Sequence, residues 1–489
     1  MNPGKKNFQK TCLMFLISFL FVGYISNAKY PEEKFATVDK LFSPWNNPQS
    51  PGCALAVIQN GEIIFKKGYG LANLEHDVKI KPSTVFRIGS ISKQFTAACI
   101  QILQREGKLS IDDNIRKYVP EMPEYDWPIT IWHLIHHTSG IRDYEWLQYF
   151  RGEHKNQAHH TNEDIIELIA RQKGLEFKPG EEFSYCNSGY TLLAAIVERV
   201  SDLSFSQFVK ARIFDPLGMN NTLIYDDNTL IIKNRATGYF KGENGYVVNE
   251  TLNESTGDGG VYTTVEDFFL WDRNFYEDKI VGPGFMESLL QVGELNDGAP
   301  VAYEHRGVQY EYAFGLTVSK YKGLRIVCHG GSYVGFRSAY VQFPDHRFSV
   351  VCLGNLSNFD PMNLCYQVAD IFLSEYFTKM ERQVLKEASS VENTENEEME
   401  LTEEQLDVYV GEYYSDELHV YYTVGFKDKH LVFTHVNPPT DSLLNTDGHD
   451  VFSFSGYEMK FIRDAAGKVT GFTFQSGKGV KDIFFEKIR

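Results

Sequence analysis

The sequence predicts an α/β chain of the α+β type: an antiparallel sheet flanked by helices, with a mostly helical inserted subdomain and a small C-terminal antiparallel β-barrel. Three observations support this prediction. Apolar runs at 53–58 and 62–65 flank Asn60-Gly61, a strong hairpin signal. Far downstream, three β-rich runs follow one another as antiparallel strands, at 325–328, 336–343 and 348–353. The C-terminal region then alternates short β-rich runs with turn residues.

Helices of the larger domain are recognised by apolar residues at helical spacing, and they are expected over 33–42, 94–105, 161–171, 190–200 and 361–376. Gly107 ends the second of these. From 109 to about 255 the chain is expected to be mostly helical, which makes this segment an insertion between the hairpin and the later strands. The last helix is expected to pack on the sheet and close the domain.

A sharp change of composition marks a domain boundary. Residues 382–405 contain eight glutamates and no aromatic residue, which is typical of a solvated linker. The β-rich runs beyond it predict the small barrel, and they lie at 418–424, 430–436, 451–454, 459–462, 469–474 and 482–486. The expected organisation is a leader at 1–28, a main domain at 29–381, the linker at 382–405 and the barrel at 406–489.

The N-terminus has the pattern of a secretory signal peptide. Three lysines precede an uncharged run that extends from 11 to 28, and its apolar centre, 12–25, is short for a membrane span. Ser26-Asn27-Ala28 then provides a cleavage site after Ala28. The protein is therefore expected to be exported, periplasmic or secreted, with no integral membrane span after cleavage. An uncleaved N-terminal anchor is the alternative.

Composition and charge limit the possible partners. The 489 residues are 43% hydrophobic and 14% aromatic, as in a folded globular protein, and the net charge is −17. This charge argues against nucleic acid or an anionic membrane as the partner, and leaves a small-molecule or peptide substrate. It does not predict an oligomeric state.

The sequence predicts neither a metal site nor a cofactor. Six cysteines beyond the leader are scattered singly among apolar neighbours without a C-x-x-C pair, so they are expected to be small buried residues. A disulfide between Cys328 and Cys352 is the alternative if they fall on adjacent strands. His133, His136 and His137 form a dense histidine run, but no third ligand pattern accompanies it.

Chemistry is suggested by three short motifs. Ser90 and Lys93 stand three residues apart at the start of the predicted helix 94–105, which puts a nucleophile and a base on one helical face. The Ser-x-x-Lys pattern occurs again at Ser319-Lys320-Tyr321-Lys322, in an expected strand and turn. This motif alone is therefore weak evidence. Tyr185-Cys186-Asn187 offers a phenol and an amide that point the same way in an extended segment.

The third motif, His329-Gly330-Gly331-Ser332, follows the expected strand 325–328. Its two glycines are expected to let a substrate backbone approach closely, and its amides are candidates for an oxyanion donor.

Together, the three motifs in this order resemble those of the serine β-lactamase and penicillin-binding protein superfamily. The middle motif has the tyrosine form of class C β-lactamases and DD-carboxypeptidases, and the last has the His-x-Gly form frequent in esterases and D-aminopeptidases. The loops His137-Thr138-Ser139-Gly140 and Gly259-Gly260 also look like family loops, so the resemblance covers about 51–377. The terminal barrel resembles the lipocalin-like appendage of some secreted members.

The resemblance implies a β-lactamase/transpeptidase-like fold and a role for each motif residue. Ser90 would form an acyl-enzyme, and Lys93 and Tyr185 would carry the proton to the leaving group. Asn187 would position the substrate amide. The amides of Ser90 and Ser332 would form the oxyanion hole, beside His329, Gly330 and Gly331.

The third motif departs from the β-lactamase pattern in its charge. His329 stands where true β-lactamases usually have a lysine that helps to hold the carboxylate of a penicillin, and a histidine is only partly charged near neutrality. Arg337 is a candidate for the missing cation, and a surface ion pair is its alternative role.

The leading functional hypothesis is an exported serine hydrolase that acts on an ester, an amide or D-amino-acid peptide, or a β-lactam. The alternative is a catalytically idle protein on the same fold that binds or senses a peptidoglycan fragment or another small ligand. The complete motif set favours the enzyme. The substrate is not predicted, because loops such as 144–160 and 297–312 shape the pocket and the sequence does not fix their positions.

Overall fold

A computed structural model describes Met1, residues 30–153, 159–378 and 401–489, apart from 428–429, 437–438, 455 and 477–479. The predicted leader apart from Met1, and most of the predicted linker, 382–400, lie outside the described residues. Within the described part of the chain, we find no helix that combines the length and the apolar character needed to cross a membrane.

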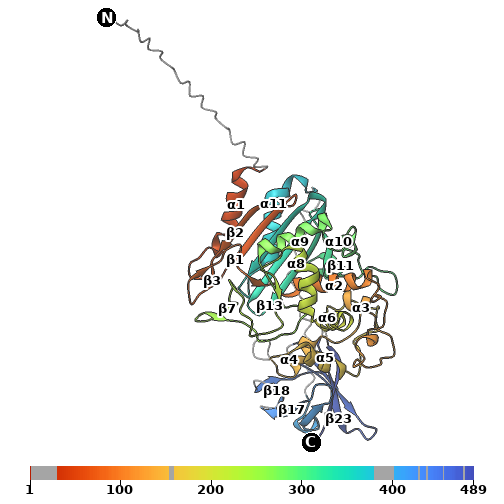
Figure 1. The fold of residues 1–489 in the computed structure, drawn as a ribbon. Helices are drawn as coiled ribbons and strands as arrows, with labels where there is room; N and C mark the ends of the chain where they lie inside the picture. The colour runs from red at the N-terminus through yellow and green to blue at the C-terminus, as the bar shows by residue number, and fades with distance from the viewer. Residues whose placement is uncertain are drawn as a thin grey trace.

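The main sheet has eight antiparallel strands in the order β10-β11-β12-β13-β14-β15-β1-β2 (Figure 1). The hairpin around Asn60-Gly61 is confirmed, since both residues have positive φ, 53° and 77°. Its first strand pairs with β15, from Cys53↔Gly354 to Gln59↔Phe348, so a sheet split by an insertion is also confirmed. The strands are β1 Cys53–Gln59, β2 Glu62–Tyr69, β10 Ala302–His305, β11 Val308–Tyr312, β12 Thr317–Tyr321, β13 Leu324–Tyr333, β14 Phe336–Phe343 and β15 Phe348–Gly354.

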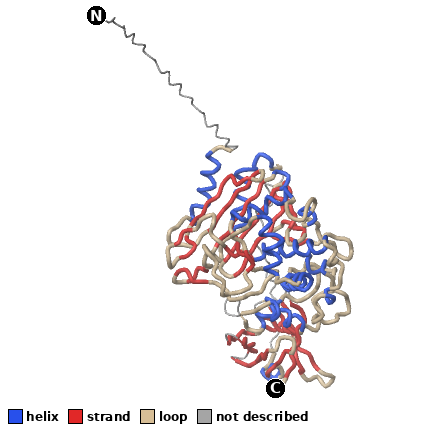
Figure 2. The backbone as a smooth tube through the Cα atoms, in the orientation of Figure 1, coloured by secondary structure: helices blue, strands red, loops and turns tan. Residues whose placement is uncertain are grey.

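Helices cover both faces of this sheet (Figure 2). On one face lie α1 (Glu32–Phe42) and α11 (Pro361–Leu373, continued by the 3₁₀ turn Ser374–Tyr376). α11 packs on β14 and β15, as predicted, whereas α1 packs against α11 and the edge strand β2. On the other face lie α2 (Lys93–Arg105) and α9 (Val265–Glu277). Successive residues of a strand point to opposite faces of the sheet, and so into different hydrophobic cores. On β15, Val350 lies in the core with α1 and α11, and Val351 lies in the core with α2 and α9.

The inserted segment is less helical than predicted. Its helices are short and joined by long loops, and they are α3 Ile131–Ile135, α4 Tyr144–Phe150, α5 Asn162–Ala170, α6 Asn187–Ser201, α7 Phe205–Val209 and α8 Asp215–Leu217, with a π-helical turn at Lys210–Phe214. Strands interrupt it because small pairings satisfy backbone groups locally. These are the hairpin β7 (Tyr239–Gly242) and β8 (Gly245–Val248), and β6 (Leu223–Ile224), which pairs with β9 (Val261–Thr263).

The remaining short elements complete the main body. β9 also pairs with β5 (Phe86–Arg87), the strand that leads into the Ser90 motif. The others are β3 Leu71–Asn73, β4 Val78–Lys79, α10 Phe285–Ser288 and 3₁₀ turns at Ser43–Trp45, Gly89–Ser92, Ile115–Lys117 and Pro344–His346.

The C-terminal region forms a nearly closed antiparallel barrel of nine strands in the order β19-β18-β17-β16-β24-β23-β22-β21-β20. Six strands match the predicted runs, and β16, β19 and β20 were missed because they are short or polar. The strands are β16 Gly411–Ser415, β17 Val420–Lys427, β18 His430–Val436, β19 Pro439–Leu443, β20 Asn445–Gly448, β21 Val451–Phe454, β22 Tyr457–Arg463, β23 Val469–Ser476 and β24 Val480–Lys487. The helix α12 (Glu403–Asp407) precedes them, and Thr402 caps its N-terminus.

All six cysteines of the described chain are buried and unpaired, which confirms their prediction as small core residues. The alternative disulfide is wrong. Cys328 lies on β13 and Cys352 on β15, and β14 separates these strands, so the two sulfur atoms are not on neighbouring strands.

The His329 motif lies inside a strand rather than after one. β13 continues through both glycines because β14 pairs with it from Val327↔Gln342 to Tyr333↔Phe336. Gly331 has a packing role that the sequence did not reveal: a Cβ there would lie 1.9 Å from the carbonyl oxygen of Ile88, in the segment leading to Ser90. The missing side chain therefore lets β13 touch the turn that carries Ser90.

This contact predicts a difference between two neighbouring glycines. We expect Gly331→Ala to lower the free energy of unfolding by about 2 kcal/mol or more, since the backbone has to shift to admit the methyl group. Gly330→Ala is the matched control, because its Cβ would make only ordinary contacts, with the methyl carbon of Met362 at 3.5 Å and the carbonyl oxygen of Ser338 at 3.9 Å. Urea unfolding of both variants measures the effect, and equal stabilities would contradict this account.

Candidate active site

Ser90 and Lys93 lie where the chain turns from strand to helix. Ser90 belongs to the 3₁₀ turn Gly89–Ser92, and Lys93 is the first residue of α2. The Lys93 side chain is fully buried, and its Nζ lies 3.4 Å from Ser90 Oγ, 2.8 Å from Asn187 Oδ1 and 2.9 Å from the carbonyl oxygen of Asp258. These acceptors solvate an ammonium that would otherwise be costly to bury.

Tyr185, in the loop before α6, and Asn187, at the start of α6, reach the same point. Asn187 is the first residue of this helix, and its backbone N–H donates to Asp143 Oδ2. Lys93 Nζ lies over the ring of Tyr185, 4.9 Å from its centroid, and this ring packs at a tilt of 36° against His137, with the centroids 4.3 Å apart. The structure thus brings Ser90, Lys93, Tyr185 and Asn187 together.

Burial and mutual contacts determine the protonation states of Lys93 and Tyr185. Burial disfavours the charge of Lys93, but Tyr185 and Asp258 favour it more strongly, so the pKa of Lys93 is raised from its ordinary value. Desolvation raises the pKa of Tyr185, and this outweighs the opposing effects of Lys93 and Ser90. At neutral pH the pair is therefore an ammonium beside a neutral phenol.

His329 is a neutral, buried side chain. Burial, together with a smaller effect of the Lys93 charge, lowers the pKa of His329 to about 4. Its Nδ1 lies 2.7 Å from the carbonyl oxygen of Gly330 and its Nε2 lies 3.4 Å from the Tyr312 hydroxyl. His329 therefore does not supply a cation at neutral pH.

Ser332, Gly330 and Arg337 border the site on the side of the sheet. The backbone nitrogen of Ser332 would lie 2.9 Å from a Cβ on Gly89, so this amide is close to the turn that carries Ser90. β12 pairs with β13 only as far as Cys328. The following residues of β13, from His329 on, therefore have no β12 partner and lie beside the site. Arg337 lines the larger hollow, and its Nη1 donates to the carbonyl oxygens of Val334 and Phe336.

Two hollows meet at Ser90, and Tyr185 and Ser332 also line both. The smaller has a volume of about 340 Å³ and three carboxylates in its wall, those of Asp143, Glu145 and Asp258. None of the described residues that line it is lysine, arginine or histidine. Asp258 is buried and accepts a hydrogen bond from the Tyr144 hydroxyl at 3.0 Å.

The larger hollow has a volume of about 800 Å³ and a wall rich in tyrosines, from the β10–β11 hairpin and the start of α11. Tyr303 and Tyr310 stack at 5.4 Å along one side, and Tyr321 and Tyr366 stack at 4.4 Å on another. Of the segments expected to shape the pocket, 144–160 contributes Glu145 and Trp146 to the smaller hollow, and 297–312 contributes residues between Tyr303 and Tyr310 to the larger one. The three carboxylates were missed, because no motif marks residues that only tertiary packing brings together.

Other sites suggested by the sequence do not form. Ser319 Oγ donates to the carbonyl oxygen of Gln309, and Lys322 pairs with Asp370 at 2.7 Å, so the second Ser-x-x-Lys match is no dyad. The His133 run is structural: His137, for example, accepts the Cys186 N–H at 3.0 Å. In the described ranges no group of three or more metal-ligating side chains gathers.

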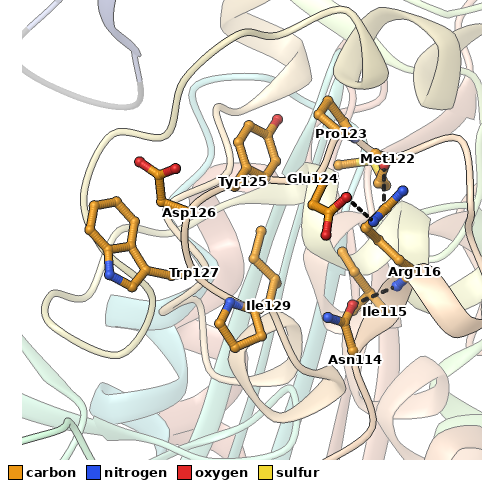
Figure 3. A pocket seen from close by; sticks show the side chains of 11 residues that line it. Asn114, Ile115, Arg116, Met122, Pro123, Glu124, Tyr125, Asp126, Trp127 and Ile129 are labelled. Carbon is orange, nitrogen blue, oxygen red and sulfur yellow. Dashed lines mark hydrogen bonds and ion pairs between the residues drawn. The ribbon is translucent and has the colours of Figure 1, made fainter.

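A third hollow, of about 230 Å³, lies between the turn at Ile115–Lys117 and the loop 122–129 (Figure 3). Arg116 pairs with Glu124 at 3.4 Å and donates to the carbonyl oxygen of Met122. None of the described residues that line this third hollow is serine, cysteine or threonine, so it offers none of these side chains as a nucleophile.

Comparison with known proteins agrees with this geometry. Residues 38–369 match the family model described as Beta-lactamase. The chain belongs to the beta-lactamase family. It is 32% identical to penicillin-binding protein 4* of Bacillus subtilis, over 63% of this chain and 68% of that protein. It is 29% identical to a D-aminopeptidase of Gluconobacter oxydans, over 62% of this chain but only 56% of that protein's length.

Solved structures show the same fold. The octameric penicillin-binding protein homologue from Pyrococcus abyssi matches 94% of this chain and 98% of its own, with a TM-score of 0.62 and 24% identity. The penicillin-binding protein from Bacillus halodurans matches 68% of this chain and 99% of its own, with a TM-score of 0.58 and 25% identity. The first match extends over the C-terminal barrel, so the fold of both parts recurs.

The burial of His329 predicts a loss of stability in acid. An unfolded histidine binds a proton below about pH 6.5, whereas His329 stays neutral down to about pH 4, so the unfolded state binds more protons in this window. Stability should therefore fall by at most about 3 kcal/mol for this residue as the pH drops from 6.5 to 4. In His329→Gln, urea unfolding should show a shallower pH dependence. Exposed His76→Gln is the control, and equal slopes in the wild type and His329→Gln would refute the effect.

Proposed function

We propose that the protein is a serine hydrolase that forms an acyl-enzyme on Ser90. The observation that supports this most directly is Lys93, fully buried and in contact with both Ser90 Oγ and Asn187 Oδ1. Ser90 attacks the carbonyl carbon of the substrate, and its O–H bond breaks as the new C–O bond forms. The amides of Ser90 and Ser332 hold the oxyanion, and removal of such a donor typically costs about 3 kcal/mol.

Lys93 and Tyr185 carry the proton in this proposal. One of them must first lose a proton, because both have raised pKa values and no base is present in the neutral-pH form. The deprotonated pair takes the proton of Ser90, and the same proton passes to the leaving amine or alkoxide. Water then attacks the carbonyl carbon of the acyl-enzyme, and the deprotonated pair takes a proton from this water. The same proton passes to Ser90 Oγ as its bond to the acyl group breaks, which releases the acid and restores the serine.

We assign the acyl part of the substrate to the smaller hollow. Asn187 Oδ1 is engaged by Lys93, which leaves Nδ2 as the Asn187 donor toward this hollow. The carboxylates of Asp143, Glu145 and Asp258 favour a protonated amine there, beside the rings of Trp146 and Tyr333. The substrate is therefore an N-terminal aminoacyl amide or peptide. Its D configuration is proposed from the similarity to the D-aminopeptidase of Gluconobacter oxydans.

The leaving group occupies the larger hollow, whose tyrosines favour an apolar or aromatic group. A penicillin is a poorer substrate, since His329 is neutral and the Nη1 group of Arg337 is engaged by backbone carbonyls.

We also propose that the protein is exported and cleaved after Ala28, on the sequence pattern of 1–28. The proposed division is a hydrolase domain at 29–381, a linker at 382–405 and a lipocalin-like barrel at 406–489. The linker includes the start of α12 at Glu403.

Substrate selection provides a test. We expect D-alanine p-nitroanilide to be cleaved with a kcat/KM roughly 10- to 100-fold higher than its N-acetyl derivative, as a charge-assisted hydrogen bond allows. Glu145→Gln should reduce this preference about tenfold, chiefly through KM, whereas exposed Glu163→Gln should not. L-alanine p-nitroanilide tests the configuration.

Ser90→Ala is the control for this series, and it should abolish cleavage of every substrate. Ser90→Ala with full activity would overturn the proposed nucleophile. A folded wild type that cleaves nothing and takes up no fluorophosphonate on Ser90 would favour the idle binding protein instead.

The proton route predicts the pH dependence of the rate. Because the base form is the minor species at pH 7, kcat/KM should rise as the pH increases above 7. Tyr185→Phe should lower kcat about 10²- to 10⁴-fold with a smaller effect on KM. Steady-state kinetics between pH 6 and 10 measure both, with the N-acetyl derivative as the substrate because it has no amine that titrates in this range. A rate that is flat or falls over this range would rule out the route.

A further inference from the structure

The C-terminal barrel shares one apolar core with the wall of the smaller hollow. Leu147 and Phe150 of α4 are buried in the core of the barrel. The ring of Phe150 packs edge-on against Phe474 at 4.8 Å, and the Tyr422 hydroxyl donates to the Phe150 carbonyl oxygen. Trp146, which lines the smaller hollow, packs against this same core. A change in the position of the barrel would therefore move α4.

A buried ion pair joins the two parts. Arg142 Nη1 lies 2.5 Å from Glu417 Oε2, and only 3% and 5% of their side chains are exposed. Arg142 also donates to Gln172 Oε1 at 3.0 Å and to the Asp482 carbonyl oxygen at 3.3 Å. The Glu417 carboxylate accepts the Lys173 backbone N–H at 2.8 Å. Both charges are thus held in one orientation by several partners.

A chain of hydrogen bonds leads from this pair to the nucleophile. The residue after Arg142 is Asp143, whose Oδ2 accepts the backbone N–H of Asn187. The carbonyl oxygen of Arg142 accepts the hydroxyl of Ser188 at 2.8 Å, which ties the same segment to α6 a second time. Asn187 Oδ1 in turn accepts Lys93 Nζ. The orientation of Arg142 therefore bears on the position of Asn187 and, through it, on Lys93.

We propose that Glu417 of the barrel is a positioning residue of the active site, which holds Arg142 and thereby fixes the Asp143–Asn187 contact beside Lys93. The barrel is then part of the catalytic unit. This inference rests on the proposed role of Ser90 as the nucleophile.

Simple anchoring of the barrel would not require this pair. The adjacent residue, Asp416, already forms an ion pair with Lys173 across the same interface at 2.7 Å, with 67% and 66% of the side chains exposed. Burying an ion pair is no better for stability than burying apolar groups of similar size, whereas it does demand one geometry. A fixed orientation next to Asp143 is what the buried pair adds.

The test is the rate at which a fluorophosphonate labels Ser90 in the full-length protein. Labelling is followed by mass spectrometry between pH 6 and 10, at a temperature well below the unfolding midpoint of each variant. Glu417→Ala should label at least tenfold more slowly. Its pH profile should move to lower pH, since a displaced Asn187 no longer stabilises the Lys93 ammonium. Glu417→Gln, which keeps the size and an acceptor, should show a loss of about threefold, and Asp416→Asn should match the wild type.

Each outcome supports or refutes the positioning role of Glu417. If Glu417→Ala does not fold, the threefold loss in Glu417→Gln is the deciding measurement. If the Glu417 variants unfold at lower temperature but label at the wild-type rate with an unchanged pH profile, Glu417 is an anchor and the inference is wrong. An unlabelled wild type would refute the proposed function along with it, whereas equal labelling of wild type and variants would refute this inference alone.

Discussion

One buried charge determines much of this structure. The ammonium of Lys93 has no access to water, so its solvation depends on Ser90 in the turn before α2, Asn187 at the start of α6 and the Asp258 carbonyl before β9. These three segments are far apart in the sequence and must be in place together. The contact between Gly331 and Ile88 then brings the edge of β13 to the same point.

Local patterns in the sequence predicted much of this arrangement. The hairpin at Asn60-Gly61, the helix after Ser90 and the three motifs were recognised because each is written in a few consecutive residues. What could not be predicted depends on packing between distant segments. β13 runs through its two glycines because β14 supplies partners for them, and Asp143 and Asp258 become neighbours of Ser90 only in the folded chain. The short polar strands of the barrel were missed because they lack an apolar pattern.

The core of the barrel is continuous with that of the main body. Aromatic rings pack in the barrel, such as Tyr422, Phe433 and Phe474, with ring centroids 4.7 Å apart for the first pair and 6.1 Å for the second. The same core includes Leu147 and Phe150 of the main body. The two parts are therefore joined by burial of side chains, and the glutamate-rich segment between them need not hold them together.

The pairing of β1 with β15 also constrains how the protein folds. Cys53 and Gly354 are paired although they are about 300 positions apart in the chain, so the main sheet has a high contact order. At 5–20 residues per second, a ribosome needs roughly 15–60 s to make the intervening chain. During that time the apolar β1 has β2 but lacks its other neighbour, β15. The main sheet is therefore completed only after β15 has emerged from the ribosome.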